Sequence, residues 1–171
     1  MAADSSPLAF ATVGTDHHRF DRLVQWIDNW LLTRRGEVRF VVQTGTSRKP
    51  VHAHAVEYVG YEEMERLVAE ATVVVTHGGP GNIMLCRRLG KKPIVVPRRS
   101  DLGEHVDDHQ LLFSRRIAIE GQIELAESEE RLRELLDLAI RDEAFMAVPA
   151  SQQSVERAVQ RFEQLLEAVL A

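Results

Sequence analysis

The segment from Ala71 to Gln110 has an order of features that constrains the fold more than any other part of the chain. A β-branched apolar run at 72–75 leads into a glycine-rich turn at 78–81, and a second apolar run follows at 94–97. We expect the residues between the turn and the second run to form a helix. Glycines let a backbone approach an anion closely, and a helix N-terminus offers free N–H groups and the positive end of its dipole. The segment therefore predicts a strand, turn, helix and strand that can bind a phosphate-bearing ligand.

The rest of the chain continues this alternation of strands and helices. We expect further strands at 8–13, 38–42 and 55–59 and an edge strand at 117–119, with helices at 19–34, 61–71, 106–115, 128–141 and 155–170. The strands are apolar throughout, which is typical of a parallel sheet covered on both faces. The predicted fold is a Rossmann-like, doubly wound α/β domain.

The chain is long enough for one such domain. Of its 171 residues, 44% are hydrophobic and 27% charged, which is ordinary for a globular protein. We expect a ligand-binding domain over residues 1–150 and a C-terminal helix over 151–171, with a break at 145–151 marked by Pro149. The apolar face of that helix comprises Val155, Ala158, Val159, Phe162, Leu165, Leu166 and Val169. This face packs either on the domain's own sheet or across a junction with a partner.

The composition argues against some functional classes and indicates the cellular compartment. The net charge of -5 gives no general nucleic-acid footprint. A single cysteine, Cys86, cannot form an intramolecular disulfide, which favours a reducing compartment. No apolar run approaches the roughly 18–20 residues of a membrane helix, and the opening MAADSSP has no secretory pattern. We expect a cytoplasmic protein whose contact with a membrane, if any, passes through a partner.

Two turns follow predicted strands and are candidates for binding phosphate. The turn at 77–81 lacks the G-x-G-x-x-G spacing of dinucleotide-binding folds. It indicates either a diphosphate pocket or an ordinary strand-to-helix turn. His77 is correspondingly a core histidine or a donor to phosphate at the carboxyl edge of the sheet, where such folds bind ligands. Gly14 and Thr15 lie beside His77 if both preceding strands are central and parallel.

The polar segment 103–110 leaves several interpretations open. His105 and His109 are four residues apart, a spacing that can hold zinc on a helix, but no third and fourth ligands are evident. Carboxylates and amides here could instead bind a hydroxyl-rich ligand, or simply lie at a solvated helix start. Arg98 and Arg99 could contact phosphate or face water.

These motifs together resemble a known family. The sequences THGGPGNIM, LGKKPIVVPRR and GEHVDDHQ resemble the carboxy-terminal half of family 28 glycosyltransferases, which have the GT-B fold. The opening AFATVGTDHHRFDRLVQWID is similar to short, stand-alone donor-binding subunits of two-part transferases. Bacterial members act in exopolysaccharide or capsule assembly, and the eukaryotic relative adds the second N-acetylglucosamine to dolichol diphosphate. The resemblance is clear over residues 8–110.

The resemblance implies roles for individual residues. Gly14 and Thr15 match the loop over the donor diphosphate, and the glycine turn after His77 matches the one whose helix points at it. Segment 104–110 matches residues that contact the sugar. The substrate-binding residues expected are Gly14, Thr15, His77, Gly78, Gly79, Gly81, Asn82, Arg98, Glu104, His105, Asp108 and Gln110. His77 and Glu104 are candidates for a catalytic role, although the base is expected in a partner.

Two positions depart from the family pattern. Many relatives carry Ser or Thr where this chain has Asn82, whose amide can still donate a hydrogen bond. Many also carry an acidic residue near Leu85 that holds the ribose hydroxyls. Leucine cannot do so, and ribose recognition in this chain is therefore expected to differ.

The family supplies an expected function. A complete GT-B enzyme has two Rossmann-like domains, and this chain is long enough for one. The resemblance implies a donor-binding subunit of an inverting glycosyltransferase that uses a UDP-sugar, such as UDP-GlcNAc or another UDP-hexose. A membrane-associated partner would hold a lipid-linked saccharide acceptor. We expect no cofactor and no metal ion; homo-oligomerisation stays open. The alternatives are a non-catalytic UDP-sugar-binding subunit and a nucleotide-sugar epimerase or hydrolase of the same fold.

Overall fold

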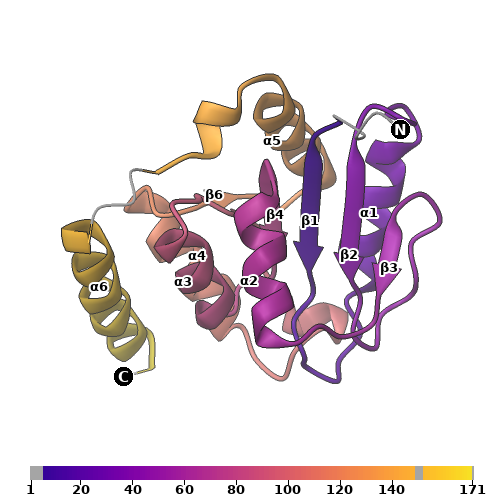
Figure 1. Cartoon of the computed structure of the whole chain (residues 1–171). Coiled ribbons are helices and arrows are strands. Elements are labelled where there is room, and N and C mark those ends of the chain that lie inside the picture. The colour runs from indigo at the N-terminus through magenta and orange to yellow at the C-terminus, as the bar shows by residue number, and fades with distance from the viewer. Residues whose placement is uncertain (1–5, 149–151, 171) are drawn as a thin grey trace.

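A computed structural model describes residues 6–148 and 152–170, which form an open parallel sheet with helices on both faces (Figure 1). The strands are β1 (Leu8–Thr12), β2 (Arg39–Gln43), β3 (His54–Val56), β4 (Val73–Thr76), β5 (Ile94–Val95) and β6 (Glu124–Leu125). The helices are α1 (Asp21–Leu31), α2 (Tyr61–Glu70), α3 (Pro80–Arg88), α4 (His109–Ile119), α5 (Glu129–Arg141) and α6 (Gln152–Leu170). Two 3₁₀ turns lie at Ser100–Leu102 and Glu143–Met146.

Each central strand is apolar on both sides because helices cover both faces of the sheet. Along β1, Ala9 and Ala11 pack with α1 and α5, whereas Leu8 and Phe10 pack with α2 and α3. Figure 1 shows α2 and α3 in front of the sheet and α1 and α5 behind it. The doubly wound α/β fold predicted from the sequence is therefore confirmed.

The strand order creates a crevice at the centre of the sheet. The order is β3-β2-β1-β4-β5-β6, and all of these strands are parallel. From β1 the chain crosses to β2 on one side, and from β4 it crosses to β5 on the other. Loops that leave in opposite directions open a crevice at the carboxyl ends of the two strands, where folds of this class bind ligands. Thr12 of β1 lies beside Thr76 of β4, which places the turns after these two strands next to each other.

Two expectations around α4 are wrong. Residues 117–119 form the last turn of α4 rather than an edge strand, and the strand at that edge is β6. Ile117 is buried with Phe113, one helical turn earlier, and Gly121 at φ 69° ends the helical segment. The helix also begins only at His109, so His105 lies in the preceding loop and the two histidines do not share a helix face.

Helix α6 packs mainly on α3 and α4. Phe162 and Leu165 are buried with residues of α3 and α4, and the rings of Phe113 and Phe162 meet edge to face at 5.8 Å. The side chains of Val155 and Ala158, and the break expected at Pro149, lie outside the described residues. None of the helices within 6–148 and 152–170 combines the length and apolar character needed to cross a bilayer.

Candidate functional site

A pocket of about 250 Å³ lies in the crevice between β1 and β4. Its walls come from the turn after β1, the turn after β4, the first turn of α3 and the loop before α2. The lining residues are Thr12, Gly14, Thr15, Gln43, Tyr58, Val59, Met64, His77, Gly79, Pro80, Gly81 and Asn82. The expectation that Gly14 and Thr15 lie beside His77 is confirmed.

The imidazole of His77 fills the space between the two glycine turns. A Cβ built on Gly14 would lie 2.5 Å from His77 Cε1, and one built on Gly79 would lie 2.3 Å from His77 Nε2. No real Cβ tolerates such contacts, so both turns need glycine because of this one ring. Gly14 has a second reason, since its φ of 82° lies in the left-handed region.

His77 is a neutral hydrogen-bonding group at physiological pH. Burial, reinforced by the nearby positive charge of Arg98, lowers the pKa of His77 from 6.5 to about 4. A neutral imidazole donates from one ring nitrogen and accepts at the other. At the edge of the pocket it can therefore donate one hydrogen bond without carrying a charge.

The start of α3 faces the same pocket. Gly79 is the N-cap residue, so it has no side chain that could compete for the first-turn N–H groups, and Pro80 at the first position has no N–H to lose. Gly81 and Asn82 line the pocket directly. Their position suits an anion, which the N–H groups and the dipole of the helix would stabilise.

A buried polar network that the sequence did not suggest holds the Gly14 turn. Thr12 Oγ1 donates to Gln43 Oε1 at 2.6 Å and accepts from Gly14 N–H at 3.2 Å. Gln43 Nε2 donates to Gly14 O at 3.1 Å and to Glu57 O at 2.9 Å. One amide thus connects the ends of β1, β2 and β3. The sequence feature that could have indicated this network is the polar residue that ends each apolar run, Thr12 in β1 and Gln43 in β2.

Gly78 has a different role from the other glycines of its turn. A Cβ there would lie 2.7 Å from Ser114 Oγ and 2.9 Å from Gln110 O, so Gly78 lets α4 approach the turn. Gln110 packs on Gly78, and its Oε1 is buried without a hydrogen-bond partner among the described residues. Buried acceptors without a partner are rare in native proteins. Gln110 itself does not line the donor pocket.

Comparison with known proteins identifies the family to which this site belongs. The model of the glycosyltransferase family 28 C-terminal domain matches residues 8–166, nearly the whole chain. The chain belongs to this family. Among curated proteins, none matches the sequence.

Solved structures show the same fold at low sequence identity. MurG of Acinetobacter baumannii superposes with a TM-score of 0.59 at 15% identity, over 97% of this chain and 50% of MurG. The glycotransferase of kitacinnamycin superposes with a TM-score of 0.55 at 17% sequence identity, over 99% of this chain and 41% of that one. The solution structure of ALG13 superposes with a TM-score of 0.56 at 17% sequence identity, over 97% of this chain and 98% of ALG13. The chain thus spans half or less of the first two proteins but nearly all of ALG13.

In this family 28 domain, Arg98 lies inside the protein. The expectation that it faces water or phosphate does not match its position, because the side chain is 0% exposed and lies 4.9 Å from the Phe20 ring centroid. Its guanidinium donates to the carbonyls of Val13, His18 and Glu104 at 2.7–2.8 Å. Arg98 therefore ties the loop after β1 to the loop after β5. Arg99, by contrast, is exposed and pairs with Asp101.

Glu104 of the family 28 domain is held by an arginine that the sequence did not single out. Arg22 donates to both carboxylate oxygens at 2.8 Å, and Arg99 N–H adds a bond at 3.0 Å. Glu104 is only 5% exposed. A carboxylate with both oxygens engaged in hydrogen bonds is better suited to positioning the loop than to accepting a proton, so the geometry gives little support to Glu104 as a base.

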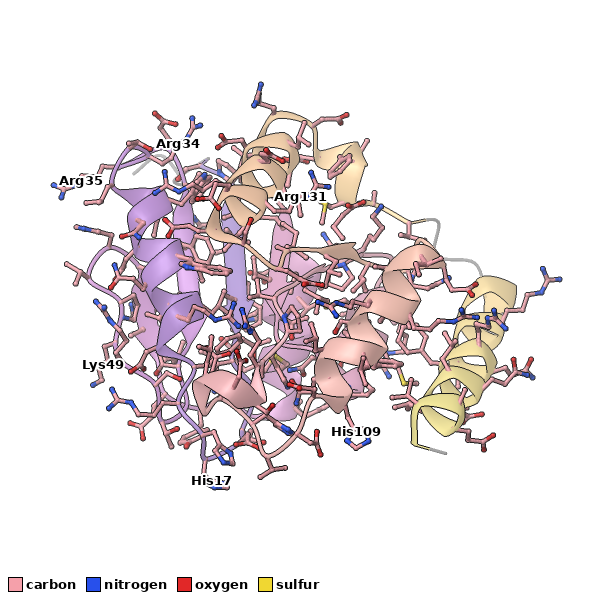
Figure 2. All side chains as sticks on the ribbon, turned by 180° about the vertical axis from the view of Figure 1, so that it is seen from behind. His17, Arg34, Arg35, Lys49, His109 and Arg131 are labelled. Carbon is pink, nitrogen blue, oxygen red and sulfur yellow. The ribbon has the colours of Figure 1, made fainter. Side chains whose placement is uncertain are left out.

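The remaining predicted residues, His105 and Asp108, lie outside the pocket in the loop before α4. His105 pairs with Asp107 at 3.3 Å and approaches Asp16 at 3.8 Å. Asp108 accepts from Ser100 N–H and Oγ, and it lines a separate polar pocket of about 330 Å³. Figure 2 shows His17 and His109 at the carboxyl edge and Arg34 and Arg35 at the opposite end. The structure thus gathers six of the predicted residues in the pocket and places the others around it.

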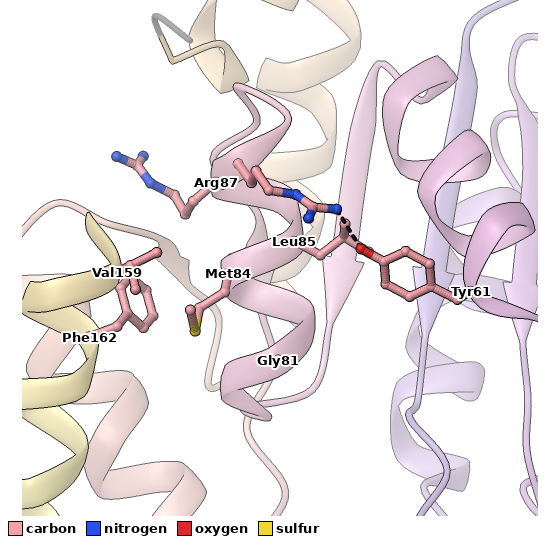
Figure 3. A pocket seen from close by; sticks show the side chains of 8 residues that line it. Tyr61, Gly81, Met84, Leu85, Arg87, Val159 and Phe162 are labelled. Atoms are coloured by element: carbon pink, nitrogen blue, oxygen red, sulfur yellow. Dashed lines mark hydrogen bonds between the residues drawn. The ribbon is translucent and has the colours of Figure 1, made fainter. Parts of the chain in front are cut away.

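Leu85 is part of the apolar packing of the family 28 domain. It is buried with Leu67 and Val68 of α2, and its edge lines an apolar groove of about 320 Å³ along the outer side of α3. Figure 3 shows Met84 and Arg87 on the side of α3 toward α6, and Leu85 on the side toward Tyr61. Leucine at this position therefore packs between two helices.

Proposed function

We propose that the chain is the donor-binding subunit of an inverting glycosyltransferase and that its donor is a UDP-sugar. The donor diphosphate would occupy the pocket between Gly14-Thr15 and Gly79–Gly81. The observation that carries this proposal is the meeting, in one crevice, of two glycine turns, the start of α3 and a neutral histidine. Membership of glycosyltransferase family 28 supports the sugar donor.

The pocket offers what the departing nucleotide needs. When the bond to the sugar breaks, negative charge grows on the diphosphate, and N–H donors and the helix dipole stabilise it best when they are already in place. His77 would add one neutral donor, and no metal ion is required in this proposal. Tyr58, Val59 and Met64 form the less polar end of the pocket, where the base would lie.

The acceptor would come from a second protein. The resemblance to ALG13 over nearly its full length supports a domain that works with a separate acceptor-binding half. In this proposal, a membrane-associated partner holds a lipid-linked saccharide and supplies the base, as in exopolysaccharide assembly. This chain then lies on the cytoplasmic side and is peripheral to the membrane through that partner. The attacking hydroxyl displaces UDP from the opposite face of the sugar, which inverts the anomeric carbon.

Gly81→Ala separates ligand binding from folding. A Cβ at Gly81 would meet no atom within 4 Å, and Gly81 lies in α3 with an ordinary φ. The variant should be as stable as the parent, or up to about 1 kcal/mol more stable. In this proposal the diphosphate lies against the Gly81 backbone, which lines the donor pocket, so a methyl group there should weaken UDP binding at least about tenfold in calorimetry, a loss of about 1.4 kcal/mol.

Gly60→Ala is the matched control, because its Cβ also meets no atom within 4 Å and Gly60 does not line the pocket. Its UDP affinity should equal that of the parent. Titrations with GDP and TDP test the base and should give weaker binding than UDP. The proposal fails if the parent binds none of the three nucleotides, or if Gly81→Ala binds UDP as tightly as the parent.

Two rival functions predict different outcomes of a transfer assay with the partner supplied. A non-catalytic subunit would bind UDP without supporting any transfer. A hydrolase would release UDP from the donor when neither acceptor nor partner is present. The proposed transferase should release UDP only when both are present.

A further inference from the structure

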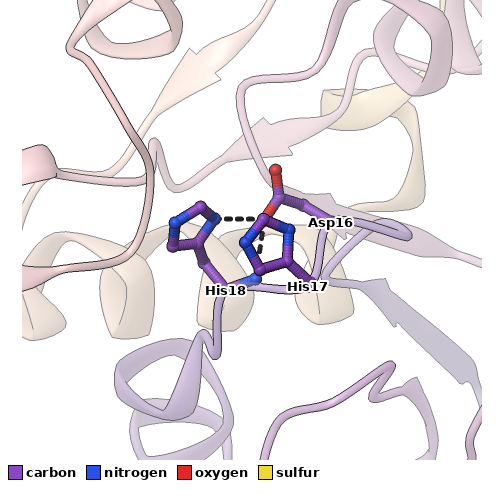
Figure 4. Close-up of side chains that lie close together, drawn as sticks. All are labelled: Asp16, His17 and His18. Atoms are coloured by element: carbon purple, nitrogen blue, oxygen red, sulfur yellow. Dashed lines mark hydrogen bonds and ion pairs between the residues drawn. The ribbon is translucent and has the colours of Figure 1, made fainter.

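Three side chains next to the donor pocket form a compact group of metal-ligand atoms. Asp16, His17 and His18 follow each other in the loop between β1 and α1, and their ligand atoms all lie within 4.8 Å of one another (Figure 4). His18 Nδ1 is 2.6 Å from Asp16 Oδ1, and His17 Nδ1 is 3.8 Å from the same oxygen. In the part of the chain that the structure describes, no second group of this kind occurs.

These separations bracket those of a tetrahedral zinc site. Bonds of about 2.0–2.1 Å from zinc to nitrogen or oxygen place neighbouring ligand atoms roughly 3.4 Å apart. Small side-chain rotations would bring 2.6 Å and 3.8 Å to that value. Three protein ligands would leave the fourth position to water.

The backbone that carries the ligands is held from outside the loop. His18 O accepts from Arg98 Nη1 at 2.7 Å, and His17 O accepts from Thr46 Oγ1 at 3.0 Å. The amide of His18 donates to Asp16 Oδ1 at 2.7 Å. A loop fixed in this way loses little conformational entropy on binding an ion, and such support is what an effective metal site needs.

The ligand types select the ion. Two imidazoles and one carboxylate suit Zn²⁺, whereas Mg²⁺ and Ca²⁺ prefer oxygen ligands alone. His105 approaches Asp16 Oδ2 at 3.8 Å from the neighbouring loop and would support the carboxylate.

We propose that Asp16, His17 and His18 bind one zinc ion, at the junction of the loops that follow β1 and β5. The proposal goes beyond the function proposed above and does not depend on it. None of the three side chains lines the donor pocket, so the zinc ion takes no part in the proposed transfer.

Calorimetry on the untagged full chain, stripped of metal with a chelator, tests the site. Titration with zinc chloride should show one saturable site per chain, and magnesium chloride should show none. His18→Ala should weaken zinc binding by about tenfold or more, since it removes a direct ligand. Asp16→Asn keeps the shape of the side chain and should also weaken binding.

His54→Ala is the control, because His54 is an exposed histidine on β3 away from the group. It should bind zinc like the parent. In histidine ring NMR spectra, zinc should shift the signals of His17 and His18 but not those of His52 and His54. The proposal is overturned if the parent shows no saturable zinc binding, or if His54→Ala loses as much affinity as His18→Ala in variants that melt like the parent.

Discussion

His77 combines burial, a neutral ring and two glycine neighbours, and its burial has a measurable effect on stability. Its pKa falls from 6.5 in the unfolded chain to about 4 in the folded one, chiefly because of burial. The unfolded state therefore binds a proton before the folded state does. Folding stability should be unaffected by this group above pH 6.5 and should fall as the pH drops from there to about 4.

The His77→Gln variant isolates this effect. One pKa unit corresponds to about 1.4 kcal/mol, so His77 should account for a loss of roughly 3 kcal/mol across that interval. Urea unfolding at fixed ionic strength measures the free energy of unfolding at pH 7 and at pH 4. Between these two values, His77→Gln should lose less of this free energy than the parent, by about the same 3 kcal/mol. His54→Gln, at an exposed position, should keep the parent's pH dependence. Equal slopes for the parent and His77→Gln would contradict the burial of a neutral ring.

At the scale of elements, the same substitution at two adjacent arginines in the loop after β5 should lower stability by very different amounts. Arg98→Met leaves three backbone carbonyls in the loops after β1 and β5 without their donor, which should cost on the order of 3–5 kcal/mol. Arg99→Met removes only an exposed ion pair with Asp101 and should cost less than about 1 kcal/mol. Chemical denaturation of both variants measures these two losses of stability. Similar losses would mean that Arg98 does not join the loops.

The elements that could be predicted from the sequence are those whose pattern is local. The apolar runs of β1 and β4 and the glycine turn that follows β4 are visible in a few consecutive residues. The Ile-Ala-Ile triplet at 117–119 fits a strand or a helix equally well. In the folded domain Ile117 is buried in one cluster with Phe162, more than 40 residues later in the chain, and no local pattern contains that neighbour.

The difference between local patterns and contacts of distant residues also explains which parts of the candidate site were predicted. The turns at Gly14 and at 77–81 were found because glycine and polar residues mark strand ends. The burial of Arg98 was not predicted, because its partners Val13 and His18 lie 85 and 80 residues earlier in the sequence. Gln43 was missed for the same reason, since its bonds join three strands that are neighbours only in the folded sheet.

At the scale of the whole molecule, α6 is attached to the rest of the domain mainly through one helix face. Phe162 is 1% exposed, and its ring packs on Phe113. Phe162→Ala should weaken this attachment by roughly 3 kcal/mol or more. Because no residue of β1 or β4 belongs to the cluster around Phe162, we expect faster hydrogen exchange in residues 157–170 and little change in those two strands.

Glu163→Ala provides the matched comparison for the α6 prediction. Glu163 neighbours Phe162 in the helix but is exposed, so this variant should exchange like the parent. Uniformly faster exchange through the sheet in Phe162→Ala would show that α6 folds as part of the core. Unchanged exchange in α6 would show that other contacts hold it.

The contact between His77 and the two glycine turns also limits how the sequence can drift over evolutionary time. While the imidazole is present, alanine at position 79 is excluded by contact alone, whereas position 14 is restricted by contact and by its left-handed backbone. Replacement of His77 by a small residue would release Gly79 but not Gly14. Substitutions at these sites should therefore be accepted in a fixed order, first at 77 and then at 79, and position 14 should stay glycine in either case.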